Sequence, residues 1–374
     1  MKILICTPEY PPLYSSGIGN VVKCLKHELE KNGLSIMTCS TICSDIELGN
    51  GIISKRFINI RSLYVSYFWY KASIYVKKHA DKYDLVWVHD PMPHFLSMFP
   101  KDRHLVITFH TVHSKYLYYS RYPKFVSRLI FLLEKHSLRN TSENVRIIAV
   151  SREVVRELTE LAIPIHKIKY IPNGVDVDMF KPASNKKHLR KKLRLPEDGI
   201  ILLSVGKLKE QKRPLVLIDV FSSIEKTIDN IYLVVIGKGH LLDEVKEYAE
   251  NKVVNKIMFL GYVNDTSEYY AAADYYIMAS SYEGQPLTLL EAMSSGLACI
   301  VSDIPNLEIV RDADCGIILS YEDPHSSANR IIEYISRNNS DHTNNARAYC
   351  LNNASWKHIA EVYTEEFKSI LSRS

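Results

Sequence analysis

The sequence contains no apolar run that approaches the roughly 20 residues needed by a membrane-spanning helix. Its first residues, MKILICTPEY, lack the long apolar segment and the cleavage site of a signal peptide. We therefore expect a cytoplasmic protein. With 374 residues, of which 46% are hydrophobic, the chain is long enough to form two domains with a core each.

A CxxC pair is also missing, so the cysteine pattern does not suggest zinc. The seven cysteines are an odd number, and Cys6, Cys39 and Cys299 fall in strand-like runs, which predicts buried free thiols. A net charge of +5 is modest and does not indicate nucleic acid as a partner. Local basic runs still favour phosphates or an anionic lipid surface.

The glycine fingerprint GxGxxG of dinucleotide-binding sheets is absent after the first apolar run, KILICT. The sequence there is GIGNVV, so a dehydrogenase stays open on fold grounds alone. The stretch PPLYSSGIG reads as a loop, followed by a helix from Asn20 to Asn32 that Gly33 ends. Gly17 in this loop is a candidate for close backbone approach to a phosphate or sugar, and a plain turn explains it equally well.

Short apolar runs alternate with helical or polar segments along the chain, which is the pattern of a doubly wound parallel sheet. The runs of the first half are KILICT, SIMTC, DLVWVHD, HLVITFH and VRIIAVS. After a basic, helical stretch from Asn185 to Arg194 the alternation restarts with GIILLSV, IYLVVIG, KIMFLGYV, YYIMAS, ACIVSD and GIILS. The sequence thus predicts an α/β chain with two parallel sheets.

Residues 275–302, YYIMASSYEGQPLTLLEAMSSGLACIVS, read as strand, loop, helix and strand. Pro286 suits the first helical turn and Gly296 the position just past the helix end, which predicts a helix from Pro286 to Ser295. Glu283 lies before this helix, on the loop leaving a buried strand, and Glu291 lies inside it. The two carboxylates therefore have different roles.

The spacing of these glutamates argues against a glycosidase pair, because it separates them by about 12 Å, whereas hydrolase pairs lie about 5 to 9.5 Å apart. An anion site fits better. The N–H groups of Gln285, Leu287 and Thr288 at the helix start, with the helix dipole, favour a phosphate. Glu291 is then placed to accept both hydroxyls of a sugar diol attached to that phosphate, which implies a nucleotide.

The segment EGQPLTLLEAMSSGLACIVSD resembles the E-x7-E signature of the retaining group 1 glycosyltransferases of family four. The resemblance implies the GT-B arrangement, two Rossmann-like domains facing across a cleft. It also implies transfer of a sugar from a nucleotide sugar to an acceptor hydroxyl with retained anomeric configuration. In that family the second Glu, here Glu291, holds the ribose. The first, here Glu283, contacts the transferring sugar, and Gly284 beside it is a donor-binding candidate.

A second segment, GKLKEQKRP, resembles the family's G-R-L-x-x-x-K-G, whose two cations grip the donor diphosphate. The resemblance assigns these roles to Lys207 and Lys212. Lys207 stands where Arg is usual, which loses the bidentate fork but keeps the charge, and Arg213 replaces the Gly.

Further candidates follow strand-like runs, where open α/β sheets bind ligands. Gly206 and Gly237 each end such a run, and Val263, after Tyr262, falls where family members hold the base through the backbone. His110 in TFHTVH resembles the family's T-x-H segment, whose His lies near the transferring sugar. His89 and Asp90 end the preceding run and are weaker candidates of the same kind.

Two aspartate pairs invite a metal interpretation, DVD at 176–178 and DAD at 312–314. The surrounding IPNGVDVDMF resembles the family's interdomain connector, where these residues make turns, and the second pair reads as a surface loop. We therefore expect no metal and no cofactor. The family's P-P-x-x-G-G-x-G loop is altered here, with Ser16 in place of a Gly and one extra residue.

At the end of the chain, SWKHIAEVYTEEFKSIL places Trp356, Ile359, Tyr363, Phe367 and Ile370 on one helical stripe. The resemblance implies that this helix crosses back onto the first domain. We expect an acceptor-side domain at 1–178, a nucleotide-sugar-binding domain at 179–353 and the returning helix at 354–374.

The expected partners are a UDP-, GDP- or ADP-sugar donor and a glycan or lipid-linked acceptor. The rival functions are a GT-B-fold epimerase or phosphorylase, and a glycosyltransferase-like subunit that binds nucleotide sugar without turnover. A phosphorylase would need a lysine-anchored pyridoxal phosphate, and no motif marks such a lysine.

Residues 61–79, RSLYVSYFWYKASIYVKKH, interleave aromatic and basic residues and are too polar to span a membrane. An amphipathic helix packed on the first sheet explains them. The alternative hypothesis is that this segment, with the tyrosines from Tyr116 to Tyr122, rests the enzyme on the inner membrane face.

Overall fold

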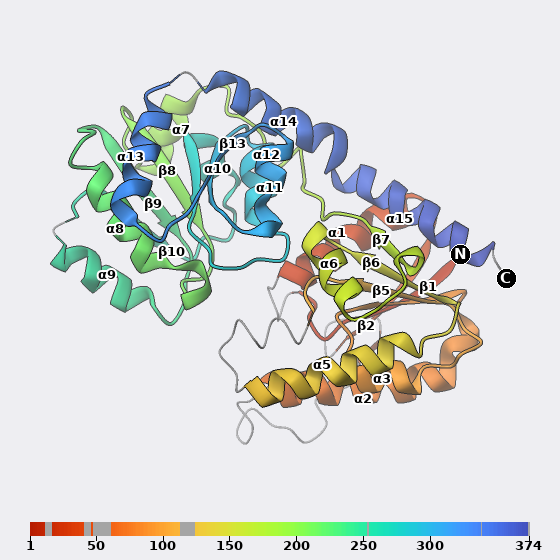
Figure 1. Cartoon of the computed structure of the whole chain (residues 1–374). Helices are drawn as coiled ribbons and strands as arrows, with labels where there is room; N and C mark the ends of the chain where they lie inside the picture. Colours follow the sequence, from red (N-terminus) through yellow and green to blue (C-terminus); the bar gives the residue numbers. More distant parts are fainter. Residues whose placement is uncertain are drawn as a thin grey trace. The chain divides into compact units, whose positions relative to one another are not determined.

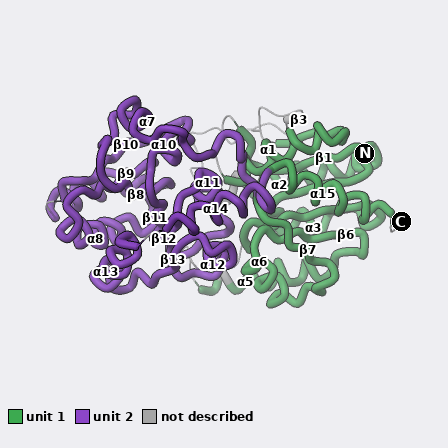
Figure 2. Tube along the Cα trace, turned by 90° about the horizontal axis from the view of Figure 1, so that it is seen from above, with its two compact units in different colours: residues 1–173, 356–374 green, residues 174–355 purple. Residues whose placement is uncertain are grey.

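The computed structural model describes residues 1–11, 17–40, 46–47, 61–112, 124–252, 254–337 and 339–372, with side chains omitted at 61–64 and 126–127. Ser16 and the tyrosines from Tyr116 to Tyr122 lie outside the described residues. The chain forms two compact units, Met1–Asn173 with Trp356–Ser374, and Gly174–Ser355 (Figure 2). Against the expected boundaries at 178 and 353, the chain changes unit after Asn173 and again before Trp356.

Unit 1 is built on a seven-stranded parallel sheet in the order β3-β2-β1-β4-β5-β6-β7. Its strands are β1 (Lys2–Cys6), β2 (Ser35–Ser40), β3 (Ile46–Glu47), β4 (Leu85–His89), β5 (Leu105–Phe109), β6 (Val145–Ala149) and β7 (Ile168–Tyr170). The apolar runs predicted β1, β2, β4, β5 and β6. The edge strands β3 and β7 were missed, because two or three residues are too few to show an alternation.

Unit 2 contains a six-stranded parallel sheet in the order β10-β9-β8-β11-β12-β13. Its strands are β8 (Ile200–Val205), β9 (Ile231–Ile236), β10 (Ile257–Gly261), β11 (Tyr275–Met278), β12 (Ala298–Ser302) and β13 (Gly316–Leu319). All six were predicted from their apolar runs. In both sheets the strand order reverses beside the first strand, which confirms two Rossmann-like domains.

The helices of unit 1 cover both faces of its sheet (Figure 1). They are α1 (Gly17–Lys31), α2 (Arg61–His79), α3 (Pro93–Met98), α5 (Lys124–Arg139), α6 (Arg152–Glu160) and α15 (Trp356–Leu371), with short 3-10 turns η1 (Ala80–Lys82) and η2 (Ile165–Lys167). Trp69 of α2, Phe95 of α3 and Leu138 of α5 pack into one core with Val86 and Ile107. On the other face α1 contacts α15.

The helices of unit 2 likewise divide between two faces. They are α7 (Lys186–Leu193), α8 (Pro214–Ile224), α9 (Leu242–Asn251), α10 (Ser267–Ala272), α11 (Leu287–Ser294), α12 (Ile309–Asp312), α13 (Pro324–Ile335) and α14 (Ser340–Asn353), with 3-10 turns η3 (Glu210–Lys212) and η4 (Pro305–Leu307). Leu290 of α11 and Cys350 of α14 share one core with Tyr276 of β11. Phe221 of α8 and Ile331 of α13 share the other with Ile277.

The last helix, α15, returns to unit 1 as expected. The five residues of its predicted stripe are all buried. Tyr363 and Phe367 pack on Trp87 of β4, with ring centroids 5.0 and 5.2 Å apart, and Arg146 of β6 forms an ion pair of 2.9 Å with Glu366. A continuous apolar stripe and one ion pair therefore hold the two chain ends in one unit.

Helix α1 begins at Gly17, three residues earlier than expected, so Gly17 and Gly19 belong to the helix and not to the preceding loop. Gly33 ends α1 with φ of 82°, a left-handed conformation that favours glycine. Among the residues that the structure describes, nothing lies within 4 Å of the position that a Cβ on Gly17 would take. The packing around Gly17 therefore does not require a glycine.

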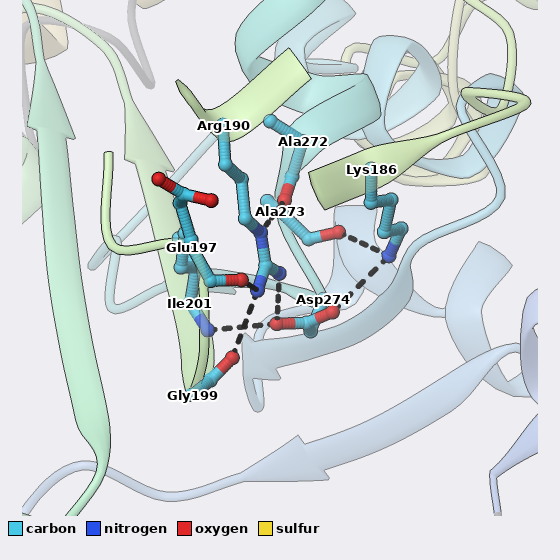
Figure 3. Close-up of polar contacts among 8 residues, drawn as sticks. All are labelled: Lys186, Arg190, Glu197, Gly199, Ile201, Ala272, Ala273 and Asp274. Carbon is cyan, nitrogen blue, oxygen red and sulfur yellow. Dashed lines mark hydrogen bonds and ion pairs between the residues drawn. The ribbon is translucent and has the colours of Figure 1, made fainter. Parts of the chain in front are cut away.

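The basic helix α7 is tied into unit 2 by its own charges (Figure 3). Buried Arg190 donates to the carbonyls of Ala272 and Gly199, both at 2.9 Å, and to Asp274 Oδ2 at 2.6 Å. Asp274 also accepts the N–H of Ile201 at 2.8 Å, and Lys186 reaches its other oxygen at 3.2 Å. Two cations of this run therefore join α7, α10 and β8, and they are not available to a ligand.

The remaining expectations concern loops and thiols. Asp176 Oδ1 accepts the backbone N–H groups of Asp178 and Met179 at 3.1 and 2.9 Å, so the DVD sequence makes a turn. Val175 donates to the carbonyl of Ala354 at 2.7 Å, which joins the two segments that connect the units. Cys6, Cys39 and Cys299 are buried free thiols, as expected.

Candidate active site

The candidate residues of unit 2 gather where β8 and β11 lie side by side at the reversal of strand order. Gly206 and Lys207 leave the carboxyl end of β8, and Glu283 lies on the loop that leaves β11. In open α/β sheets this point is where the loops diverge and a ligand is bound. The topology thus brings together residues that are more than 70 positions apart in sequence.

Lys212 and Glu283 form an ion pair in this region, with 2.5 Å between Nζ and Oε1. Only 8% of the Glu283 side chain and 19% of the Lys212 side chain are exposed, so water screens the pair weakly. A Cβ on Gly206 would lie 3.4 Å from Cε of Lys212, an ordinary van der Waals contact, so the lysine side chain lies directly beside this glycine. The two groups that the sequence assigned to diphosphate and sugar are therefore direct partners.

Hydrogen bonds fix the loop that carries Glu283. Gln211 Nε2 donates to the carbonyl of Tyr282 at 2.7 Å, and the N–H of Ser281 donates to the carbonyl of Gln211 at 2.8 Å. The side-chain amide of Asn306, on η4, donates to the carbonyl of Glu283. Sequence reasoning missed Gln211 and Asn306, because nothing in their own segments indicates a partner so far along the chain.

The glycines after β8 and β9 allow two loops to touch. A Cβ on Gly237, whose φ is 145°, would lie 1.8 Å from the carbonyl oxygen of Gly206, and one on Gly239 would lie 1.9 Å from that of Leu208. Backbone hydrogen bonds run from Gly206 to Ile236 and from Leu208 to Lys238, at 2.9 and 3.1 Å. Gly237 is therefore required by loop packing; its contact with a donor stays a prediction.

A small pocket lies at the same edge of the sheet. Among the groups that line it are Gly206, Lys207, Lys212, Met278 and Ser280. Within the described part of the chain the Ser280 hydroxyl is buried without a hydrogen-bond partner. The rest of the lining is mostly apolar, so Lys207, Lys212 and the Ser280 hydroxyl are the groups there that suit an anionic oxygen.

Helix α11 begins at Leu287, with extended Pro286 as the residue before its first turn. The expected helix was one residue longer at each end, and the proline in fact precedes it. Its N-cap residue, Pro286, makes no side-chain hydrogen bond to the helix start. Leu287 and Thr288 supply N–H groups of the first turn, while Gln285 precedes the helix. The hydroxyl of Tyr276 donates to Thr288 Oγ1 at 2.8 Å.

Glu291 lies on α11 and is paired with a residue that sequence reasoning missed. The hydroxyl of buried Tyr270, on α10, donates to Glu291 Oε2 at 2.9 Å. Burial raises the pKa of Glu291 to about 7, and the hydrogen bond from Tyr270 opposes part of that rise. Burial also raises the pKa of Tyr270 well above its ordinary value, so the phenol stays protonated and able to donate.

Val263 follows β10, next to the exposed ring of Tyr262, and packs partly against the core of the α11 side of the sheet. The ammonium group of Lys238 lies 5.9 Å from the centre of the Tyr262 ring. This places the predicted base contact after β10, the strand at the end of the sheet order.

In unit 1 the candidate residues lie at the ends of β4 and β5. His89 Nδ1 and His110 Nε2 are 3.0 Å apart, and Asp90 Oδ1 accepts the backbone N–H of His110 at 2.8 Å. Burial lowers the pKa of His110 to about 4, and burial with the neighbouring His110 lowers that of His89 well below its usual value. Both rings are therefore neutral near pH 7, and the weaker candidates His89 and Asp90 contact the stronger one.

Comparison with known families matches almost the whole chain. The family model of "Glycosyl transferases group 1" matches residues 185–354, and that of "Glycosyltransferase Family 4" matches residues 15–179. The two matches fall on the two halves of the chain that the sheets define.

Two relatives support the same family, and one solved structure shares the fold. The chain is 30% identical to the UDP-Gal:alpha-D-GlcNAc-diphosphoundecaprenol alpha-1,3-galactosyltransferase of Escherichia coli, over 70% of this chain and 68% of that protein. It is 26% identical to the alpha-monoglucosyldiacylglycerol synthase of Streptococcus pneumoniae, over 98% and 86%. The fold matches sucrose-phosphate synthase from Thermosynechococcus elongatus with a TM-score of 0.83, at 18% identity and 100% coverage of both chains. With two Rossmann-like sheets, two family matches and these relatives, the chain belongs to the group 1 glycosyltransferases of the GT-B fold class.

Proposed function

We propose that this glycosyltransferase moves a sugar from a nucleotide-sugar donor to an acceptor hydroxyl, retains the anomeric configuration and needs no metal ion. The observation that carries the proposal is the ion pair of Lys212 and Glu283. It lies beside the pocket after β8 and on the loop that precedes α11. A cation, a carboxylate and a helix start meet there, as donor binding requires.

In this proposal the leaving diphosphate is stabilised by Lys212, Lys207 and the first turn of α11. Negative charge grows on this group as the bond to the sugar breaks, and preorganised positive groups lower the barrier to that step. The ammonium group of Lys207 offers the phosphate a compact positive charge, without the two parallel N–H donors of an arginine. An ammonium group has three N–H donors, so Lys212 can hold Glu283 and a phosphate oxygen together.

Glu283 and Glu291 bind the two other parts of the donor, the transferring sugar and the ribose. Glu283 accepts hydroxyls of the transferring sugar, and Glu291 accepts the two ribose hydroxyls. Glu283 is held by Lys212, and Glu291 by Tyr270. Neither carboxylate is therefore assigned as the base, and the leaving phosphate accepts the acceptor's proton on the same face of the sugar, which keeps the configuration.

The acceptor is a glycan or a lipid-linked sugar, bound by unit 1. The names of the two relatives point to lipids, a diphosphoundecaprenol in one and a glucosyl diacylglycerol in the other. No helix of the described residues is long and apolar enough to cross a bilayer. We accordingly propose a cytoplasmic enzyme that works at the inner membrane face.

Calorimetry on two variants tests the donor site. Glu283→Gln is expected to impair use of the nucleotide sugar while free nucleoside diphosphate binds nearly as before, because the amide alters the sugar contact and Lys212 keeps its charge for the diphosphate. Glu291→Ala is expected to weaken the nucleoside diphosphate itself. The reverse pattern would exchange the two roles, and unchanged binding in both variants would place the donor elsewhere.

A thermal-shift or saturation-transfer panel of UDP-, GDP- and ADP-sugars identifies the base. Stabilisation by one class, with release of the free sugar or transfer to an acceptor, supports an enzyme. Binding without any turnover would instead indicate a nucleotide-sugar-binding subunit.

A further inference from the structure

Helix α5 of unit 1 carries a row of exposed apolar side chains. Phe125, Leu129, Leu132 and Leu133 are 72, 55, 61 and 45% exposed. Their spacings of four, three and one residues place them on one side of the helix, since a turn holds 3.6 residues. Exposed apolar residues elsewhere in the described chain are more scattered, and single ones are normal on protein surfaces. We call these four residues the α5 stripe.

The opposite side of α5 anchors the helix. Leu138 belongs to the core of unit 1, Phe131 packs partly against it, and the side chain of Glu134 is buried. These positions lie about half a turn from the α5 stripe. Helix α5 also contacts α3, which in turn contacts α2. The stripe is therefore the outer face of a firmly packed helix.

Basic residues run alongside the stripe. Lys124, Arg128, Lys135 and Arg139 recur at spacings of four, seven and four residues, which sets them in a second row along α5. The sequences of α2, α3 and α5 together contain eight lysines and arginines and one acidic residue, Glu134. Because Glu134 is buried, this layer has no exposed acidic side chain to pair with its cations.

These rows favour one kind of partner. A second copy of the chain would bring like charges near each other, with no acidic group on the layer to compensate. An anionic bilayer supplies both an apolar interior and negative headgroups, and amphipathic helices with basic flanks lie in that interface. We propose that the α5 stripe inserts into the interfacial region of an anionic membrane while the basic row binds its headgroups.

The proposed membrane contact therefore lies on α5, whereas the hypothesis from the sequence placed it on α2. In α2, Phe68, Trp69, Ala72 and Val76 are buried in the core, so two of its five described aromatic side chains, the tryptophan among them, are not available to lipid. Tyr70 and Ile74 remain exposed and can add to the contact. The inference deepens the proposed function, since it places unit 1 against the surface that would hold a lipid-linked acceptor, but binding to lipid requires no turnover.

Co-sedimentation with phosphatidylglycerol vesicles at low salt tests the inference. Two exposed substitutions, Phe125→Ser with Leu132→Ser, are expected to weaken binding at least tenfold, because each large apolar side chain loses its transfer from water. Arg128→Ala with Arg139→Ala is expected to weaken it roughly fivefold per charge and to reduce the salt dependence. Ile165→Ser is the matched control, since Ile165 is 63% exposed in the same unit and should leave binding unchanged.

Thermal unfolding and nucleoside diphosphate binding of the same samples separate this inference from the proposed function. Intact nucleotide binding with loss of vesicle binding supports the α5 stripe. No sedimentation of the wild type, equal binding to phosphatidylcholine vesicles, or full binding by the Phe125/Leu132 variant would overturn it. A dimer that the same variant abolishes would reassign the stripe to self-association.

Discussion

The candidate groups of the two units differ in charge. In unit 2, Lys212 and Glu283 face each other as a cation and an anion at 2.5 Å. In unit 1, His89 and His110 face each other at 3.0 Å, and burial keeps both rings neutral. A charged pair suits a step in which charge develops on phosphate, whereas a neutral pair suits hydrogen bonds to sugar hydroxyls.

The two units also differ in what can be measured. All three tryptophans, Trp69, Trp87 and Trp356, belong to unit 1. Tryptophan fluorescence therefore reports unit 1 alone, while circular dichroism reports helices of both units. This asymmetry allows each prediction to be assigned to one unit.

The largest effect is expected from Arg190→Met, which removes the buried cation of the α7 network but keeps most of its packing. It leaves Asp274, whose side chain is 27% exposed, with Lys186 as its remaining cationic partner, so the cost lies near the lower end of the roughly 3 to 5 kcal/mol for breaking a buried pair. Urea unfolding followed by circular dichroism should shift accordingly, with tryptophan fluorescence unchanged. A joint shift of both signals would show that the two units unfold together. Fluorescence would then no longer report the stability of unit 1 separately.

Lys212→Ala is expected to slow transfer by ten- to a hundredfold, because one charge-assisted contact contributes about 1.5 to 3 kcal/mol. Steady-state kinetics measure this, with Lys191→Ala on the exposed side of α7 as the control. Adding Glu283→Gln to Lys212→Ala removes the unpaired carboxylate and should restore stability but not rate. A near-wild-type rate in Lys212→Ala would place the lysine outside the site.

The neutral histidines predict a loss of stability in acid that unit 1 alone should show. The pKa of His110 in the folded chain is about 4, below the unfolded value of about 6.5. Its contribution is thus complete above pH 6.5 and lost as the pH falls toward 4, at up to about 1.4 kcal/mol per pH unit. His110→Gln should flatten the curve followed by tryptophan fluorescence, and His27→Gln, with an exposed ring, should not.

The pKa of Glu291 is raised where that of His110 is lowered, and it predicts a smaller loss in acid, here of nucleotide binding. The carboxylate form accepts ribose hydroxyls, and with a pKa of about 7 it is mostly ionised at pH 8 and mostly protonated at pH 6. Nucleoside diphosphate should therefore bind about tenfold more weakly at pH 6. Tyr270→Phe removes a hydrogen bond that lowers this pKa and should move the midpoint upward. Calorimetry with a flat pH profile in both proteins would contradict the assignment.

How far the sequence anticipated the structure depended on the range of the interactions. Long apolar runs predicted all of the second sheet, and the period of α15 predicted its buried stripe. Both signals lie within one element. The start of α1 was misjudged because Gly17 was read as a loop residue, although a glycine is tolerated at the first helical positions.

The partners of the candidate site residues could not be found in this way. Tyr270 reaches Glu291 from 21 positions away, and Gln211 reaches Tyr282 from 71. Such pairs leave no periodic pattern, because the sheet and its loops create the proximity. The basic run of α7 shows the same limit, since its charge was visible but its partner Asp274 is 84 positions from Arg190.

The smallest expected effect is that of metal removal. If Lys207, Lys212 and the start of α11 neutralise the leaving diphosphate, a divalent ion has no charge left to balance there. Transfer measured in excess EDTA should equal transfer in its absence, and magnesium should add nothing. The comparison is sharpest in Lys212→Ala, where one of the two lysines is gone. A wild-type rate that falls with EDTA and returns with magnesium would mean that the metal and not the lysines carries this charge, whereas a magnesium effect seen only in Lys212→Ala would mean that the metal replaces the missing lysine. The candidate site of unit 2 would then, like the neutral histidines of unit 1, supply no charge of its own to the leaving diphosphate.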